Sequence, residues 1–316
     1  MNSYYGKDFI TTKGLERSDL EELFDLAQKM EKIAKDRTRC NMLNDSILGL
    51  MFFQVSTRTR ISFESAMRRL GGSVVGFVDP KTTRIGDYYK ESMHDVTRMM
   101  ENYADVLVIR HPVNGAPEDA ARITDVPIIN AGDGDNEHPT QALLDLYTIR
   151  CEKGTIDDLK IGFVGDMNLR VFHSLPLALA NYQSKAYFIS PPDISMPAVW
   201  LDEFKQTGLD FEEISSLDSI LDDLDVIYME GVKTPSYHIG RTETVDTRPE
   251  MPQEWILDSE KMKRLKENAI ILHPLPRTEE LPKEVDAHES AKYFTQAGNA
   301  VPVRMALLSL ILGRSL

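Results

Sequence analysis

Cysteine is scarce in this sequence. Only Cys40 and Cys151 occur among 316 residues, far apart and without the spacing of metal ligands. Two such residues provide neither a disulfide framework nor a zinc site, and disulfides persist mainly in oxidising compartments. The sequence therefore does not belong to the class of small disulfide-stapled secreted proteins, and a reducing, cytoplasmic setting fits it best.

Long apolar runs are missing as well. Nowhere do about 18 consecutive apolar residues occur, the minimum for a membrane-spanning helix. The segment 1–13 lacks the apolar stretch of a secretory signal. We therefore expect a soluble protein that has no membrane partner.

Positive charge is in deficit. The chain has 36 Lys and Arg residues against 50 Asp and Glu residues, a formal net charge of −14. Nucleic acids and anionic membranes reward a basic surface, so this balance disfavours both as partners. An anionic substrate would need arginines that are concentrated locally.

The composition and length are those of a folded protein with two domains. Charged residues make up 27% of the 316 residues and hydrophobic residues 42%, which is ordinary for a globular protein. Apolar, β-branched runs alternate with helical patterns along the chain. This alternation predicts an α/β fold with two domains, each a parallel sheet flanked by helices.

The expected elements follow from the apolar pattern. The expected strands cover 47–53, 73–78, 104–110, 126–130, 160–164, 185–190, 224–229 and 269–273. The expected helices cover 15–35 with Ser18 as its cap, a stretch beginning near Thr57, 92–103, 139–154, 173–181 and 305–312.

A polar and cationic segment, Ser-Thr-Arg-Thr-Arg at 56–60, follows the first expected strand and opens a helix. A helix N-terminus offers unpaired N–H groups and a partial positive charge, so it binds anions readily. Ser56, Thr57 and Thr59 would add hydroxyl donors, and Arg58 a guanidinium fork that suits phosphate. The ordinary alternative is a capped helix with solvated arginines, because Ser and Thr are common N-caps.

Other expected strands also end on polar residues. These are Arg110, His138, Arg170 and His273, and Gln141 lies one helical turn beyond His138. Ligands of open parallel sheets bind at the carboxyl ends of strands, so the convergence favours an anion site. Each residue also has an ordinary structural explanation. His138 could cap the helix that follows it, and Arg110 could be the partner in a surface ion pair. His273 is expected to shape its turn rather than to transfer protons.

Taken together, these motifs resemble the aspartate and ornithine carbamoyltransferase family, most closely its aspartate branch. Their order and spacing match the family over nearly the whole chain. The matching segments are Ser-Thr-Arg-Thr-Arg-Ile-Ser-Phe-Glu at 56–64, Arg-His-Pro at 110–112, Asn-Ala-Gly-Asp-Gly at 130–134, His-Pro-Thr-Gln at 138–141, His-Pro-Leu-Pro-Arg at 273–277 and Gln-Ala-Gly-Asn at 296–299.

The resemblance implies transfer of the carbamoyl group of carbamoyl phosphate to an amino-acid amine, without a metal or an organic cofactor. L-aspartate is the first expectation for the acceptor, as in pyrimidine biosynthesis. The implied phosphate ligands are Ser56, Thr57, Arg58, Thr59 and Arg110. The carbonyl oxygen would meet Thr59, Arg110 and His138, and the carbamoyl NH2 would meet Gln141 and the backbone carbonyls of Leu275 and Pro276.

The resemblance also implies a domain organisation and an assembly. A carbamoyl-phosphate domain would comprise 1–138 and 293–316, an acceptor domain 152–292, and a linking helix 138–152. The expected assembly is a homotrimer whose sites are shared between subunits, and a regulatory chain remains open. The residue entering the neighbouring site would be Lys90 or, if the loop is rebuilt, Arg84.

The acceptor half departs from the family pattern. Arg170 matches the ligand of the α-carboxylate, although its loop is one residue shorter. The arginine that grips the side-chain carboxylate is replaced by Gly231, between Glu230 and a segment that contains Lys233. Three hypotheses follow. Aspartate remains the acceptor with Lys233, Arg241 or Arg248 as substitute; a different amine is the acceptor; or the chain is a silent paralogue that binds carbamoyl phosphate.

Overall fold

The computed structural model describes residues 3–85, 90–231 and 253–314. The chain forms two compact units, Met1–Leu143 with Asn299–Leu316, and Leu144–Gly298. The expected substitutes Lys233, Arg241 and Arg248 lie outside the described residues.

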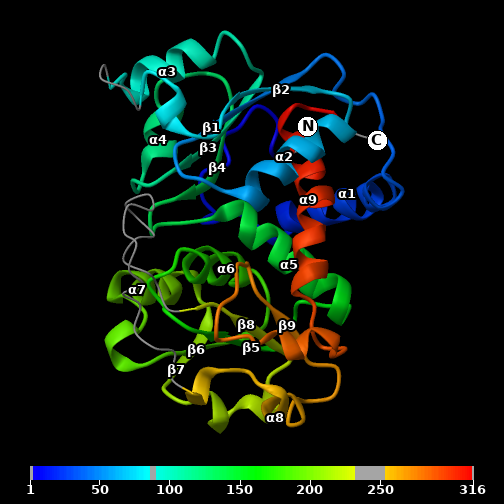
Figure 1. Ribbon diagram of the computed structural model, residues 1–316, viewed down its shortest axis with the longest axis vertical. Helices are drawn as coiled ribbons and strands as arrows, with labels where there is room; N and C mark the ends of the chain where they lie inside the picture. Colours follow the sequence, from blue (N-terminus) through cyan, green and yellow to red (C-terminus); the bar gives the residue numbers. More distant parts are fainter. Residues whose placement is uncertain (1–2, 86–89, 232–252, 315–316) are drawn as a thin grey trace. The chain divides into compact units, whose positions relative to one another are not determined.

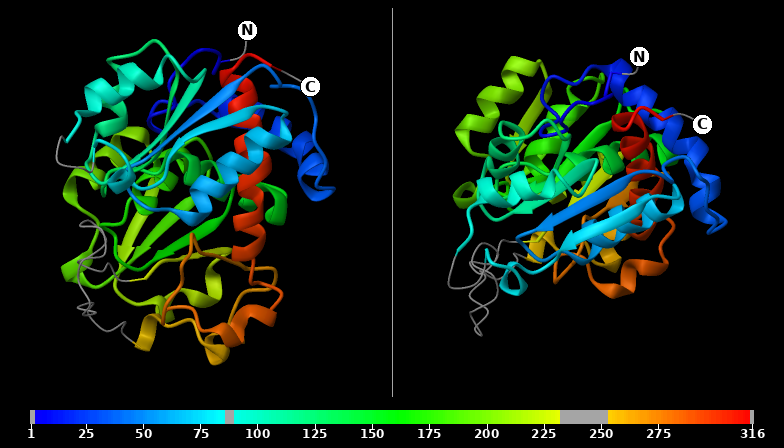
Figure 2. Two further views of the ribbon diagram at one scale, coloured as in Figure 1. Left: turned by 45° about the horizontal axis from the view of Figure 1, so that its top comes forward. Right: turned by 90° about the horizontal axis from the view of Figure 1, so that it is seen from above.

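The first unit is built on a four-stranded parallel sheet with the strand order β2-β1-β3-β4. Its strands are Ile47–Phe52 (β1), Ser73–Phe77 (β2), Val106–His111 (β3) and Ile128–Asp133 (β4). Its helices are Arg17–Lys35 (α1), Thr57–Arg69 (α2), Met93–Met100 (α3) and Ala116–Ala121 (α4), and α2 runs along β1 and β2 (Figures 1 and 2). The predicted parallel sheet is confirmed here.

The two central strands of this sheet are buried on both faces. In β1 and β3 all but one residue of each strand is buried, as expected for a parallel sheet covered by helices. Met51, Leu107 and Ile109 pack with Val96 and Met100 of α3 in one apolar cluster. This packing fixes the ends of β1 and β3, where the polar residues of interest begin.

The second unit is built on a five-stranded parallel sheet with the order β7-β6-β5-β8-β9. Its strands are Lys160–Val164 (β5), Lys185–Ile189 (β6), Asp210–Ile214 (β7), Val226–Met229 (β8) and Ile270–Leu272 (β9). Its helices are Val171–Leu179 (α6), Ala198–Thr207 (α7) and Ser259–Met262 (α8), while Pro139–Lys153 (α5) and Tyr293–Ile311 (α9) each belong partly to both units.

Some local predictions were wrong or incomplete. Ser18 lies inside α1; the cap is Glu16, whose backbone N–H donates to Asp19 Oδ2 at 3.0 Å. The helix expected over 305–312 begins at Tyr293, because α9 tolerates Pro302 in its interior. The edge strand β7 was missed because its sequence, Asp-Phe-Glu-Glu-Ile, is mostly charged and little buried.

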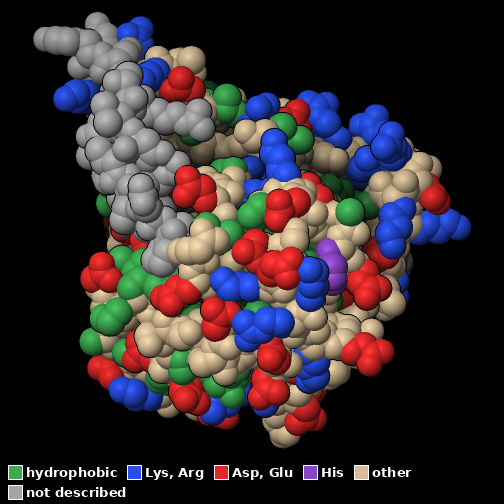
Figure 3. Space-filling model, turned by 60° about the horizontal axis from the view of Figure 1, so that its bottom comes forward, with side chains coloured by type: hydrophobic (Ala, Val, Ile, Leu, Met, Phe, Trp, Pro, Cys, Tyr) green, Lys and Arg blue, Asp and Glu red, His purple; other side chains and the backbone are tan. Residues whose placement is uncertain are grey.

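The surface carries both signs of charge. On the face drawn in Figure 3, acidic side chains are spread widely and basic ones lie among them. Among the described residues, no helix combines the length and the apolar character that crossing a bilayer requires.

Candidate active site

The polar segment after β1 forms the N-terminus of α2. Ser56 is the N-cap, and its Oγ accepts a hydrogen bond from the backbone N–H of Thr59 at 3.3 Å. The helix begins at Thr57, as predicted. Thr57 and Arg58 are exposed on the first turn, whereas Thr59 is only 5% exposed. The turn therefore presents backbone N–H groups, hydroxyls and a guanidinium at one helix end, the arrangement that suits an anion.

Arg110 lies at the carboxyl end of β3 and is 7% exposed. Its Nη1 donates to the carbonyl oxygen of Ala131, just beyond the middle of β4, at 3.1 Å. Its own carbonyl accepts the backbone N–H of Phe53 at 2.8 Å. The arginine is thus held between the two strands that flank β3.

His138 directly precedes α5, and its side chain meets both preceding elements. Its Nε2 lies 3.4 Å from Thr59 Oγ1 and 3.4 Å from Arg110 Nη1. Because a guanidinium can only donate, Nε2 is the acceptor in the contact with Arg110. We call Thr59, Arg110 and His138 the donor cluster. The structure brings these three predicted residues together from α2, β3 and the start of α5.

The residue before His138 is anchored by the N-terminal segment, which the sequence did not indicate. Glu137 is 6% exposed. Its Oε2 accepts the backbone N–H of Thr12 at 3.2 Å and the Thr12 hydroxyl at 3.3 Å. Its Oε1 accepts the hydroxyl of Thr11. A buried carboxylate is costly unless such donors surround it, so these threonines support the start of α5.

The Asn-Ala-Gly-Asp-Gly motif covers the last four residues of β4 and the first residue after it, and its side chains organise the loop that follows. The Asn130 amide donates to Asp133 Oδ1 at 2.8 Å and accepts the backbone N–H of Gly132 at 2.8 Å. Gly134 has φ +41°, and a Cβ there would lie 1.8 Å from Asn114 Oδ1. The loop thus requires glycine at 134, and it delivers the chain to His138.

The remaining predicted residues of the first unit are less tightly grouped. Gln141 is half-buried in the first turn of α5, and its backbone N–H donates to the His138 carbonyl at 2.9 Å. Lys90 and Arg84 are both exposed. The entry of Lys90 into a neighbouring site stays a prediction.

In the second unit Arg170 immediately precedes α6 and is 3% exposed. Its backbone carbonyl accepts the N–H groups of His173 and Ser174, each at 3.2 Å. The backbone of Arg170 is therefore fixed at the start of a buried helix, following the loop from β5. Its role toward an α-carboxylate stays a prediction.

The His-Pro-Leu-Pro turn follows β9 and contains the predicted residues Leu275, which is half-buried, and Pro276, which is exposed. His273 is 1% exposed, and its Nδ1 accepts the backbone N–H of Leu275 at 2.8 Å. Its Nε2 lies 2.8 Å from Glu280 Oε1. The ring therefore ties the two ends of the turn together, and the prediction that His273 shapes this turn is confirmed.

Glu280 is stabilised in its charged form. Burial by itself raises the pKa of this carboxyl, but hydrogen bonds from His273 and from the backbone and hydroxyl of Thr278 outweigh it and hold the pKa to about 2. The buried pair thus includes a carboxylate that remains ionised through the physiological range.

A second polar chain supports the same turn from within the unit. Gln296 Oε1 accepts the backbone N–H of His273 at 2.8 Å, and its Nε2 donates to Asp145 Oδ1 at 2.7 Å. The other oxygen of Asp145 accepts the Tyr228 hydroxyl at 2.8 Å. Asp145 was missed because a lone carboxylate in an amphipathic helix ordinarily faces solvent, whereas here it is fully buried.

Gly231 lies beside the carboxylate of Glu280. A Cβ at position 231 would be 3.1 Å from Glu280 Oε2 and 3.2 Å from Thr278 Oγ1. A side chain at 231 would therefore start next to a negative charge inside the second unit. Within residues 3–85, 90–231 and 253–314, no group of three His, Cys, Asp or Glu side chains is arranged to hold a metal ion.

Comparison with known proteins accounts for this arrangement. Residues 7–151 match the family model described as aspartate/ornithine carbamoyltransferase, carbamoyl-P binding domain, and residues 157–311 match the Asp/Orn binding domain. The aspartate carbamoyltransferase catalytic subunit of Methanopyrus kandleri is 44% identical, over 99% of both chains. That of Thermococcus gammatolerans is 41% identical, over 98% of both chains.

A solved structure points the same way. The crystal structure of aspartate transcarbamoylase from Trypanosoma cruzi in complex with carbamoyl phosphate and aspartate has a TM-score of 0.87 to this chain at 33% identity, over 98% of each chain. With two domain models matched in order and relatives this similar over their full length, the chain belongs to the aspartate/ornithine carbamoyltransferase family.

Proposed function

We propose that this chain transfers the carbamoyl group of carbamoyl phosphate to L-aspartate, forming N-carbamoyl-L-aspartate and inorganic phosphate, a reaction of pyrimidine biosynthesis. The donor cluster carries the proposal, because the imidazole of His138 lies 3.4 Å from both the Thr59 hydroxyl and the Arg110 guanidinium, beside a helix N-terminus. The names of relatives at 41–44% identity support aspartate as the acceptor.

The phosphate of the donor is assigned to the first turn of α2. Ser56, Thr57 and Thr59 supply hydroxyl and backbone donors there, and Arg58 is exposed on the same turn. A helix N-terminus favours a dianion through both its N–H groups and its dipole. Arg110 adds a charge that is already fixed by its contact with Ala131. These residues bind the leaving group as well as the substrate.

The chemistry is attack of the neutral amine on the carbamoyl carbon, which forms the C–N bond, followed by loss of phosphate as the C–O bond breaks. The proton that the nitrogen loses leaves with the phosphate. Negative charge develops on the carbonyl oxygen in between, and preorganised donors stabilise such an oxyanion. The Thr59 hydroxyl and the Arg110 guanidinium are the assigned donors. His138 is assigned to the same oxygen and donates to it from Nε2 when that nitrogen carries a proton, in place of its contact with Arg110. No nucleophilic side chain is required, because positioning of the two substrates supplies much of the acceleration.

The acceptor assignments belong to the second unit and stay predictions. They are Arg170 and Lys233, and Lys233 lies outside the described residues. Leu275 and Pro276, in the same unit, are assigned to the carbamoyl NH2 through their backbone carbonyls. Despite Gly231, the named relatives favour aspartate over a different amine. The silent-paralogue hypothesis is less well supported, because the residues expected to bind the donor are present.

A product assay tests the proposal. Purified chain is incubated with carbamoyl phosphate and L-aspartate, L-asparagine, L-glutamate or L-ornithine, and ureido product is quantified. We expect kcat/KM for aspartate to exceed that for isosteric asparagine by about 100-fold, since one charge-assisted contact contributes about 2–3 kcal/mol. A faster reaction with another amine would overturn the acceptor. Donor binding without any carbamoylation would support a silent paralogue.

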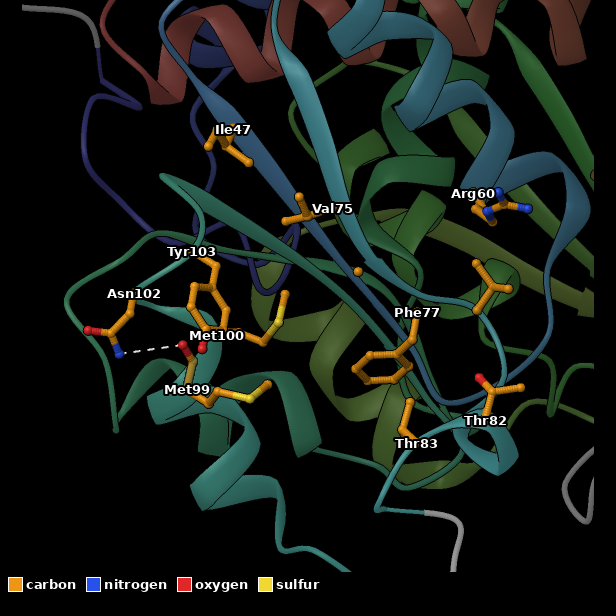
Figure 4. Close-up of a pocket in the computed structure, with 12 residues that line it drawn as sticks. Ile47, Arg60, Val75, Phe77, Thr82, Thr83, Met99, Met100, Asn102 and Tyr103 are labelled. Atoms are coloured by element: carbon orange, nitrogen blue, oxygen red, sulfur yellow. Dashed lines mark hydrogen bonds between the residues drawn. The ribbon is translucent and has the colours of Figure 1, made fainter.

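We further propose that the chain forms a cytoplasmic homotrimer with shared sites. An apolar hollow of about 980 Å³ along the edge strand β2 supports self-association, since exposed apolar hollows mark interaction surfaces (Figure 4). Its walls include Val75, Met99 and Tyr103, which are 40%, 39% and 55% exposed. Neither Cys40 nor Cys151 is in a disulfide bond, in keeping with a reducing compartment.

Mixing two inactive variants tests site sharing. Arg58→Ala removes a residue of the proposed phosphate site, and Lys90→Ala removes the residue proposed to enter the neighbouring site. Light scattering should first give the mass of three chains. Mixed, re-associated subunits should regain part of the wild-type rate if one site combines residues of two chains, whereas no recovery would show that each chain carries a complete site.

A further inference from the structure

A cation lies within the apolar C-terminal helix. Arg304 of α9 is 1% exposed, and its neighbours Val303 and Met305 are fully buried. Taking a guanidinium out of water costs several kcal/mol unless nearby groups offset the loss. An apolar side chain of similar volume would satisfy the packing here, so the charge at this position calls for a reason other than filling space.

The guanidinium of Arg304 contacts the segment that opens α2. Its Nη1 donates to the carbonyl oxygen of Thr59 at 3.3 Å and to the hydroxyl of Ser62. Its guanidinium carbon lies 4.6 Å from the ring centroid of Phe63. Helix α9 passes beside α2 in the first unit, as Figures 1 and 2 show. The cation therefore touches three residues of one short stretch, 59–63.

Ser62 extends this contact to the first turn of α2. Its hydroxyl lies 2.5 Å from the carbonyl oxygen of Arg58 and 3.0 Å from that of Thr59. When the hydroxyl accepts from Arg304, its own proton is directed to these carbonyls. Arg304 thus fixes the backbone of Arg58 and Thr59, two residues assigned to the donor phosphate.

We propose that Arg304 is a positioning residue of the donor site, which holds the first turn of α2 and adds a fixed positive charge behind it. This inference rests on the proposed function, because it takes that turn as the binding site for the phosphate of carbamoyl phosphate. Charges interact more strongly in a poorly polarisable interior than in water, so a buried cation acts on a nearby dianion with little screening. Its contribution is largest when phosphate occupies the turn.

The competing explanation is a structural role alone, in which Arg304 only joins α9 to α2. The two explanations differ in what a neutral side chain does. With a purely structural role, Arg304→Met alters thermal stability and leaves phosphate affinity unchanged. With a positioning role, affinity falls even where the variant is as stable as the wild type, as apolar replacements of buried charges can be.

Calorimetric titration with inorganic phosphate at low ionic strength tests the proposal on the full chain. Arg304→Met should raise the Kd for phosphate by at least about 10-fold, equivalent to 1.4 kcal/mol. Arg304→Lys, which keeps the charge, should stay within about 3-fold of the wild type. At saturating carbamoyl phosphate the KM for aspartate should change less than about 2-fold. Arg314→Met, which removes an exposed cation of the same chain end, is the matched control.

The outcomes separate this proposal from the one that it rests on. Wild-type affinity for phosphate in a folded Arg304→Met variant would overturn the role of Arg304 and leave the donor site intact. A wild-type chain that binds no phosphate would instead overturn the donor site itself. If Arg304→Met does not fold, Ser62→Ala takes its place: it retains the charge, loses the hydroxyl link, and should weaken phosphate binding by about 3-fold; unchanged binding in it would overturn the proposal.

Discussion

The two units hold their predicted site residues in different ways. In the first unit, Thr59 and Arg110 belong to a helix and a strand, and His138 directly precedes α5. In the second unit, Arg170 ends the loop between β5 and α6, and Gly231 follows the last residues of β8. The donor is the same for every carbamoyltransferase of the family, whereas acceptors differ. Residues assigned to the shared donor thus belong mainly to regular elements of the first unit, whereas Arg170 and Gly231, which concern the acceptor, lie in loops of the second.

The supporting interactions show the same contrast. Residues of the donor cluster contact one another and the main chain of β4. Arg304 donates to the Thr59 carbonyl, and the anchored Glu137 directly precedes His138. The turn after β9 instead depends on a chain of side chains through His273, Glu280 and Gln296. A substitution in the first region should therefore affect chemistry directly, whereas one in the second should affect mainly stability.

The largest expected effect is in the donor cluster. Arg110→Ala should lower kcat/KM by about 10³-fold, because it removes a charge proposed to contact both the phosphate and the developing oxyanion. Steady-state assays with both substrates measure it. Arg122→Ala, which removes an exposed arginine paired with Glu118 and Asp119, is the control and should match the wild type. An Arg110→Ala variant within 10-fold of the wild type would contradict the assigned role.

The next effect concerns stability in acid. The pKa of Glu280 is held to about 2, below that of an unfolded glutamate. The ionised carboxylate therefore contributes to the free energy of unfolding above about pH 4.3, and this contribution is lost as the pH falls toward 2. Glu280→Gln should reduce the unfolding free energy at pH 7 by about 2 kcal/mol. Between pH 5 and pH 2 its stability should also fall less steeply than that of the wild type.

Chemical denaturation at several pH values measures this difference. Glu279→Gln, a change at the exposed neighbouring residue, is the matched control and should follow the wild-type curve. Parallel curves for wild type and Glu280→Gln would show that the buried carboxylate is not linked to acid unfolding.

A smaller effect would sharpen the acceptor side. Gly231→Arg should lower the KM for aspartate by about 10-fold if position 231 faces the side-chain carboxylate, since a guanidinium fork binds carboxylates in two places. Gly231→Ala is the control. Its Cβ meets Glu280 Oε2 at 3.1 Å without adding charge, so it reports crowding alone. An unchanged KM in Gly231→Arg would place this residue away from the acceptor.

The smallest effect is at the cap of α2. Ser56→Ala removes the oxygen that accepts the Thr59 N–H, which should cost about 1 kcal/mol of stability and weaken phosphate binding by a few-fold. Ser65→Ala, on the same helix but away from its end, should leave phosphate affinity unchanged. Equal phosphate affinity in the two variants would limit Ser56 to a structural cap.

Much of the fold was predictable because its strands are short apolar runs bounded by polar residues. The predicted strand over 160–164 coincides with β5, and the helix beginning near Thr57 is α2. Charged edge elements such as β7 carry no such pattern, because neither face of an edge strand needs to be apolar. The helix α7 was also missed, although Gly208 in the left-handed region marks its end.

The site divides along similar lines. Thr59, Arg110 and His138 were predictable because strand ends bring residues distant in sequence to one edge of a sheet. Arg304 and Glu137 were not, since their importance lies in burial and in partners far along the chain. A single arginine in an apolar helix was the available signal for Arg304, and it gains meaning only once the facing residues are known.

The anchoring of Glu137 by Thr11 and Thr12 makes the N-terminal segment part of the support of the proposed donor site. Loss of the first dozen residues, by proteolysis or by choice of start codon, would strip a buried carboxylate of its donors directly beside His138. Such a shortened chain would keep every residue assigned to the reaction. We expect its catalytic rate to fall nevertheless, because the residue next to His138 would lose its hydrogen-bond donors.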